Sequence, residues 1–231
     1  MNLHDFIETI GFSDHRASYH EILLAAVGGF LGILAIFMVS QSLFDSALAV
    51  VIVPSMGASA VLLFAAPHAP FSQPWNVVAG HIVSAAIGVA CWQWIPDLTV
   101  AASVAVGLAI GAMYFARCTH PPGGATALAA VIGSDQLHGL GYVYVFQPIM
   151  LNVATMLLVA ILFNGLFKWR RYPARLSVKP EPTRPGPSTS ASISHEDFVY
   201  ALSQIDTIID VSEEDLLKIY QLATKRHRQT P

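Results

Sequence analysis

The stretch ILLAAVGGFLGILAIFMVSQS, residues 22–42, contains no charged side chain and is long enough to cross a lipid bilayer as one helix. One helical crossing needs about 20 mostly apolar residues, because the hydrocarbon core is about 30 Å thick. Further apolar stretches follow at 75–95, 97–113 and 142–167, and we expect a helix in each. These stretches predict an all-α membrane protein built as a polytopic helical bundle.

The distribution of charge supports the same fold class. Of the 231 residues, 54% are hydrophobic and 12% are charged, a more apolar balance than soluble domains have. Between Ile22 and Phe167 the charged residues are Asp45, Asp97, Arg117 and Asp135. Basic residues instead follow the last apolar stretch, at Lys168, Arg170, Arg171, Arg175, Lys179 and Arg184. Because basic flanks stay in the cytoplasm, we expect a bacterial inner (plasma) membrane protein with a cytoplasmic C-terminus.

The sequence divides into four parts. These are an N-terminal cytoplasmic segment (1–20), a membrane domain (21–170), a proline-rich linker (171–193) and a small amphipathic helical tail (194–231). The first part lacks the apolar core of a cleavable signal peptide. In the tail, serines three residues before an acid predict two short helices. Such helices bury little surface alone, so we expect them to pack on a partner, on each other or on the membrane domain.

Two apolar segments, 46–66 and 114–133, contain prolines and glycines that interrupt an ordinary helix. Both share the pattern P-x-x-G-A-[ST]-A, starting at Pro54 and Pro121. We expect a broken or half-helix in each, and three elements per half then predict an inverted 3+3 repeat. The alternative is that residues 121–132 form a loop or re-entrant turn, which gives an odd number of crossings and an external N-terminus.

Interrupted helices in a bilayer occur where the freed backbone groups face protein or a watery cavity. Helix N-termini present free N–H groups and the positive end of a dipole, which suits an anion. Glycines allow close approach to the backbone, and hydroxyls add donors. The candidate substrate-binding residues are Pro54, Ser55, Gly57, Ser59, Arg117, His120, Pro121, Pro122, Gly123, Gly124 and Thr126.

Several of these polar residues have two interpretations. Arg117 is either a functional charge within the membrane or the marker of the end of the preceding helix. His120 is either a proton carrier or a residue whose ring bonds a neighbouring carbonyl at a helix start. His81, Asn76 and Asn152 lie on apolar helices, where they serve in coupling or as interhelical hydrogen-bonding groups.

The motif Thr119-His120-Pro121-Pro122-Gly123-Gly124-Ala125-Thr126-Ala127 resembles the HPP family of integral membrane proteins, named for its His-Pro-Pro motif. The stretches 53–60 and 73–81 and the final helix extend the resemblance over roughly residues 20–168. It implies a multi-spanning membrane protein, and some plastid and cyanobacterial members are associated with nitrite transport. Some members carry paired CBS domains after the membrane part, whereas here we expect only the linker and a short helical tail to follow it.

Two functions from different classes follow. The first is a secondary transporter or channel for a small inorganic anion, most of all nitrite, held at the N-termini of two half-helices. The second is a non-transporting membrane scaffold whose C-terminal helices recruit a partner or mediate oligomerisation. No motif for hydrolysis, nucleotide binding or a metal occurs, so we expect no enzyme and no cofactor. The expected partners are the anion, the lipid bilayer and other copies of the chain, and not nucleic acid.

Overall fold

The computed structural model describes residues 17–43 and 46–176, with side chains described outside 43–53. The N-terminal segment and the tail at 194–231 lie outside the described residues, as does most of the predicted linker. Every regular element in the described part is a helix, which confirms the all-α class.

The helices follow one another closely along the chain. They are α2 (Tyr19–Leu43), α3 (Ser46–Ala65), η1 (Pro70–Ser72), α4 (Pro74–Trp94), α5 (Leu98–Phe115), α6 (Pro122–Ile132), α7 (Asp135–Leu140), η2 (Val145–Met150), α8 (Leu151–Gly165) and η3 (Ala174–Leu176). Among the described residues, four spans are long and apolar enough to cross a membrane: α2, α4, α5 and the continuous pair η2 and α8. They match the four apolar stretches from which the fold was predicted.

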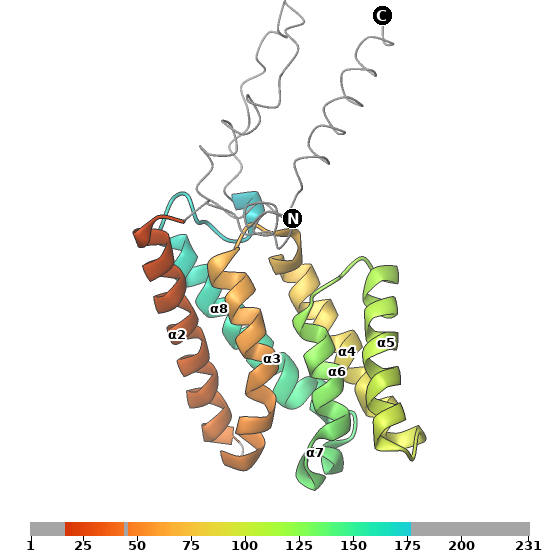
Figure 1. Cartoon of the computed structure of the whole chain (residues 1–231). Helices are drawn as coiled ribbons and strands as arrows, with labels where there is room; N and C mark the ends of the chain where they lie inside the picture. Colours follow the sequence, from red (N-terminus) through yellow and green to blue (C-terminus); the bar gives the residue numbers. More distant parts are fainter. Residues whose placement is uncertain (1–16, 44–45, 177–231) are drawn as a thin grey trace, which may run out of the picture. The chain divides into compact units, whose positions relative to one another are not determined.

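The helices of the bundle run in alternating directions (Figure 1). Helices α2, α4 and α6 run one way, and α3, α5 and α8 run the other. The start of α2 and the end of α8 therefore lie at the same end, where Glu21 pairs with Arg170. Within the described residues the chain enters and leaves the bundle at one end, so the alternative with an odd number of traversals is wrong. The alternation fits an inverted repeat, which itself stays a prediction.

The break predicted at Pro54 is absent, and the half-helix interpretation of 46–66 is wrong. Helix α3 is continuous from Ser46 to Ala65 with Pro54 inside it. Proline removes one backbone donor and disturbs one preceding turn, and membrane helices tolerate this where neighbouring groups satisfy the freed backbone. The first copy of the shared pattern therefore has no helix N-terminus to offer an anion.

The second interrupted segment is broken as expected, and residues 121–132 are not a loop. Helix α5 ends at Phe115, and α6 begins at Pro122. Arg117 takes the left-handed conformation (φ 52°) after α5, while the backbone N–H of Cys118 bonds the Met113 carbonyl at 2.9 Å. This helix-ending motif usually uses glycine. Helix α6 has 11 residues, or about 16 Å, roughly half the hydrocarbon thickness.

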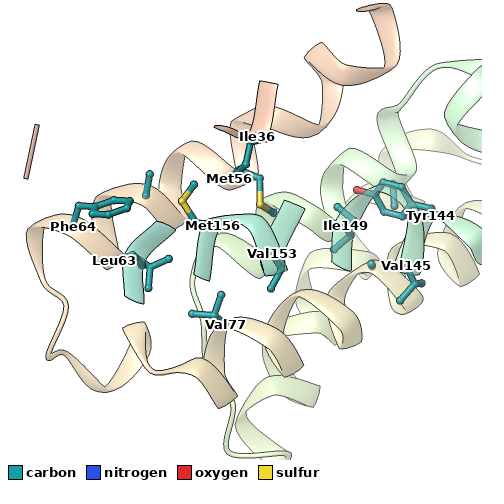
Figure 2. Close-up of a cluster of buried hydrophobic side chains, with 14 of the residues drawn as sticks. Ile36, Met56, Leu63, Phe64, Val77, Tyr144, Val145, Ile149, Val153 and Met156 are labelled. Carbon is teal, nitrogen blue, oxygen red and sulfur yellow. The ribbon is translucent and has the colours of Figure 1, made fainter. Parts of the chain in front are cut away.

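The largest apolar core lies among α3, α4 and α8 and extends to the segment before η2 (Figure 2). Its fully buried members include Met56, Phe64, Val77, Tyr144, Val153 and Met156. A second, smaller cluster joins α4, α5 and α6 and consists mainly of alanines at Ala101, Ala105, Ala109 and Ala127. Helix α4 takes part in both clusters, so polar side chains on α4 meet α3 on one side and α6 on the other.

The segment after α8 is fastened to the end of α3. Arg170, one of the basic residues predicted to face the cytoplasm, is only 3% exposed. Its guanidinium pairs with Glu21 and donates to the Phe64 carbonyl, and its Nε donates to Asn164 Oδ1 at 3.3 Å. The bond to Phe64 satisfies a carbonyl oxygen in the last turn of α3, where carbonyls lack a partner within the helix. Arg170 is therefore a structural residue that joins α2, α3 and α8.

Candidate functional site

A chain of hydrogen bonds runs through the interior between α3, α4 and α6. The hydroxyl oxygen of Ser59 on α3 lies 2.9 Å from His81 Nε2 on α4. The same oxygen lies 3.0 Å from Nε2 of His120, which precedes α6. On its other side, His81 Nδ1 lies 2.7 Å from the hydroxyl of Thr126 on α6. Ser59 thus bridges two imidazoles, and the side chains of Ser59, His81, His120 and Thr126 form one polar cluster.

Each outer end of this polar cluster meets the backbone. His120 Nδ1 lies 2.8 Å from the carbonyl oxygen of Phe71, in the turn η1 before α4. The Thr126 hydroxyl also lies 3.3 Å from the Pro122 carbonyl one turn earlier. The phenol of Tyr144 donates to the Thr126 carbonyl at 3.3 Å. The cluster therefore connects α3, α4, α6, η1 and the segment before η2.

All four members of the polar cluster are buried. His81, His120 and Thr126 are 0% exposed and Ser59 is 1% exposed. An ionisable side chain inside a membrane domain is costly, and in most proteins it has a functional role. Both imidazoles have partners on both ring nitrogens, so the cluster is also compatible with a stable closed bundle.

Small residues let the backbones approach closely around the two histidines. A methyl group on Gly80 of α4 would lie 2.7 Å from His120 Cβ and 3.1 Å from the Cys118 carbonyl oxygen. A methyl on Gly123 would lie 2.7 Å from the Ser84 hydroxyl, and one on Gly88 would lie 2.5 Å from the Ala127 carbonyl. These three glycines set the distance between α4 and the His120–Ile132 segment.

The structure brings together only part of the predicted site. Ser59, His120 and Thr126 meet, and they are joined by His81, which was expected to act either in coupling or between helices. Asn76 is also an interhelical group, because it donates to the Thr119 carbonyl at 2.9 Å. Asn152 accepts a hydrogen bond from Ser40 at 2.9 Å, linking α8 to α2, while its amide nitrogen has no partner.

Other predicted site residues do not join the polar cluster. Pro54 and Pro121 are exposed, and a side chain added at Gly57 would meet nothing within 4 Å. Ser55 is buried, and its carbonyl lies 3.2 Å from the Ser59 hydroxyl. At Gly124 an added methyl would reach only Val106, at 4.0 Å. Arg117 is exposed at the end of α5, which fits the interpretation that it marks the helix end.

The start of α6 also differs from the predicted anion site. Pro121 and Pro122 have no backbone N–H, since both are prolines. The N–H of Gly123 bonds the His120 carbonyl at 2.8 Å, and the N–H of Gly124 bonds the Pro121 carbonyl at 3.1 Å. Backbone groups that the sequence predicted to be free are therefore already paired. The donors that remain near α6 are side chains, above all those of His120 and Thr126.

Sequence analysis missed two contributors to the site. The Phe71 carbonyl fixes His120, but no side-chain pattern identifies a backbone acceptor in a turn. Gly80 lies directly before His81, yet its contact with His120 requires the packing of α4 on the loop at 116–121. Within the described residues no group of three or more His, Cys, Asp or Glu side chains is placed to hold a metal ion.

Comparisons with known proteins give the family of this chain. The model of the HPP transmembrane region matches residues 14–173. The chain belongs to the HPP family. A transmembrane protein of Dictyostelium discoideum is 40% identical over 162 residues, covering 68% of this chain and 52% of the relative. A second transmembrane protein of the same organism is 37% identical over 157 residues, covering 66% and 55%.

This HPP protein spans about half the length of the curated relatives that it matches. The matched region contains the whole polar cluster, from Ser59 to Thr126. No solved structure matches the chain. The family and the apolar helices together make this an integral membrane protein.

Proposed function

We propose that this HPP protein is a secondary transporter or channel for a small inorganic anion, with nitrite as the first candidate. The observation that carries the proposal is the buried pair of His81 and His120, bridged by Ser59 inside the membrane domain. The binding site in this proposal is the polar cluster itself, and no longer the N-termini of two half-helices.

The charge of the cluster favours an anion over a cation. Imidazole is either neutral or positive near neutral pH, and the hydroxyls of Ser59 and Thr126 stay neutral. Among the described residues that are buried, Arg170 alone carries a permanent charge, and Glu21, the carboxylate that pairs with it, is only partly buried. A cation that entered this interior would lose its hydration without a negative partner. An anion would meet N–H and O–H donors and a pair of groups able to become positive.

The choice of nitrite as the substrate rests on the family resemblance, whereas the proposal of a small anion rests on the residues of the polar cluster. Nitrite is small and has two oxygen acceptors, so it can take a hydrogen bond from an imidazole and another from a hydroxyl at the same time. Because the cluster is buried, the anion reaches it only when the helices around it separate. We infer that the structure is a closed state of such a cycle, and that the basic segment after α8 faces the cytoplasm.

The test is nitrite uptake by the purified full chain in sealed liposomes. We expect uptake above that of empty liposomes, together with competition by nitrate, formate or chloride that ranks the anions. His81→Gln and His120→Gln should each reduce uptake at least ~10-fold, since a hydrogen bond to a charged group contributes about 1.5–3 kcal/mol. His20→Gln is the matched control, because His20 is exposed at the start of α2.

Absence of anion flux for the full chain, or unchanged uptake by both buried-histidine variants, would contradict the proposal. In that case the scaffold function becomes the better hypothesis. It predicts that deletion of residues 190–231 abolishes the cellular role while the membrane domain stays folded.

A further inference from the structure

We propose that Thr126, His81, Ser59 and His120 form a proton relay, in which the Ser59 hydroxyl passes a proton between the two imidazoles. This inference rests on the proposed anion transport and adds its coupling ion, the proton. The geometry that points to it is the continuous series of side-chain contacts at 2.7, 2.9 and 3.0 Å from Thr126 to His120.

The Phe71 carbonyl fixes the direction of every bond in the neutral relay. A carbonyl oxygen only accepts, so the proton of neutral His120 must sit on Nδ1, which faces Phe71 at 2.8 Å. Nε2 of His120 is then an acceptor and takes the hydroxyl proton of Ser59. Since Ser59 has one proton, His81 Nε2 must carry the proton between them and donate it to Ser59. His81 Nδ1 then accepts from the Thr126 hydroxyl.

Rotation of the Thr126 hydroxyl accommodates an extra proton on His81. Protonated Nδ1 of His81 donates to the oxygen of Thr126, and the Thr126 hydroxyl turns to the Pro122 carbonyl, 3.3 Å away. Ser59 has a similar second acceptor, the Ser55 carbonyl at 3.2 Å. Both hydroxyls therefore have an alternative acceptor for their proton at a slightly longer distance, as a reversible relay requires.

The transfer step between the histidines conserves every atom and charge. The Nε2–H bond of His81 breaks as its proton joins the Ser59 oxygen, and the original O–H bond of Ser59 breaks as that proton joins Nε2 of His120. His81 becomes neutral with its proton on Nδ1, and His120 becomes the cation. Beyond His120 the chain of bonds ends at the Phe71 carbonyl, which cannot pass a proton on. In this closed conformation the relay moves a proton between two sites and does not leak it across the membrane.

The surroundings of the pair explain why a proton and an anion would travel together. The packed elements contribute Ser55 from α3, Ser84 from α4, Met113 from α5 and Cys118 from the loop before His120. Tyr144 faces Thr126 from the segment before η2. None of these groups is a carboxylate, and Arg170 is engaged by Glu21 elsewhere. A positive charge on the pair is therefore offset by a bound anion rather than by the protein.

The decisive variant is Ser59→Ala, which removes the bridging hydroxyl and leaves both imidazoles. With an inward proton gradient across liposomes, we expect nitrite accumulation, and the proton uptake that accompanies it, both to fall at least ~10-fold. Ser59→Thr keeps a hydroxyl and should restore accumulation. Ser103→Ala is the matched control, because Ser103 makes the same hydroxyl-to-carbonyl bond one turn back, to Thr99 at 2.8 Å, on the exposed face of α5.

Two outcomes separate this inference from the proposed function. If wild-type liposomes show no nitrite flux, the proposed function fails. If they transport nitrite without moving protons, as seen by a pH dye inside, the relay alone fails. The relay also fails if Ser59→Ala accumulates nitrite as well as the wild type.

A second measurement tests the relay without any transport. Infrared difference spectra of the purified full chain, with isotope-labelled histidine, should show an imidazole proton shared by the pair on acidification from about pH 8 to 4. Ser59→Ala and His81→Gln should both alter that band, whereas Ser103→Ala should not. A spectrum without proton uptake by either buried imidazole would overturn the relay, whatever the transported solute is.

Discussion

The phenol of Tyr172 donates a hydrogen bond of 2.6 Å to the backbone carbonyl of Ser72. Ser72 follows Phe71, whose carbonyl accepts from His120. The segment after α8, which contains Tyr172, makes a second hydrogen bond to this turn: the Ala174 N–H donates to Gln73 Oε1 at 3.1 Å. The chain just after α8 therefore holds the turn that fixes His120. Position and orientation of the buried histidine pair thus depend on a segment far from it in sequence.

Tyr172→Phe should loosen this turn. The lost bond leaves the Ser72 carbonyl short of a partner, and we expect a loss of about 1 kcal/mol in the free energy of unfolding, measured by thermal unfolding in detergent. Burial raises the pKa of Tyr172 above its ordinary value, so the phenol stays a donor at neutral pH. Its contribution is present below about pH 10 and is lost as the pH rises further. Tyr114→Phe, on an exposed tyrosine, should leave the free energy of unfolding at neutral pH unchanged.

Arg170 should be more important for stability than Glu21. Arg170→Met removes the bonds to Glu21, the Phe64 carbonyl and Asn164 together, and breaking such a buried pair commonly costs 3–5 kcal/mol. Glu21→Gln keeps a neutral acceptor and should cost less. Arg170→Lys should rescue little, because an ammonium group lacks the planar fork that reaches three partners. Equal melting temperatures for Arg170→Met and the wild type would show that these contacts are dispensable.

Gly80→Ala should impair the site through packing alone. The added methyl would lie 2.7 Å from His120 Cβ, so His120 and α4 must move apart and the bond between His120 and Ser59 is disturbed. We expect a loss of about 1–3 kcal/mol in stability from overpacking, together with loss of nitrite accumulation. Gly107→Ala on α5 is the matched control, since its methyl would meet nothing within 4 Å and should raise helix stability slightly. If Gly80→Ala transports normally, His120 does not need its present position.

Substitutions at Arg117 can distinguish the effect of its charge from the effect of its left-handed backbone conformation. Arg117→Gly suits the left-handed conformation at φ 52° and should stabilise the end of α5 by up to about 1 kcal/mol. Arg117→Gln keeps the strain and removes the charge. If the charge guides anions to the membrane domain, both variants should lower the apparent affinity for nitrite similarly, and Arg117→Lys should not. Wild-type uptake kinetics in all three variants would leave Arg117 as a helix-end marker only.

Single cysteines can test which end of the bundle faces the cytoplasm. Tyr19→Cys and Arg175→Cys should behave alike, because both exposed positions lie at the end where α2 begins and α8 ends (Figure 1). Gln136→Cys on α7 lies at the opposite end. We expect an impermeant thiol reagent added to intact cells to label only Gln136→Cys. The native cysteines, Cys91 and Cys118, are buried and should stay unlabelled. Labelling of Tyr19→Cys from outside would show that the protein has the opposite orientation in the membrane.

The sequence alone determined the membrane class and the positions of most helices. Apolar length and the scarcity of charge decide both, because burial of backbone groups in lipid permits few alternatives to a helix. The break predicted in segment 114–133 was readable for a similar local reason, since proline suits the first turn of a new helix and α6 begins at Pro122. The same local rule misled at Pro54, where α3 continues because proline's lost bond is tolerated inside a bundle.

Only the tertiary structure decided which candidate residues form a site. Ser59, His81 and His120 belong to three separate segments, and the sequence gives no sign that one hydroxyl lies within 3.0 Å of both imidazoles. Their meeting depends on the close approach of α4 to the segment before α6, which Gly80 and Gly123 permit. Local sequence encodes local backbone preferences and apolar faces. The pairing of buried polar groups instead follows from how those faces pack, because each buried donor or acceptor must find its partner in three dimensions.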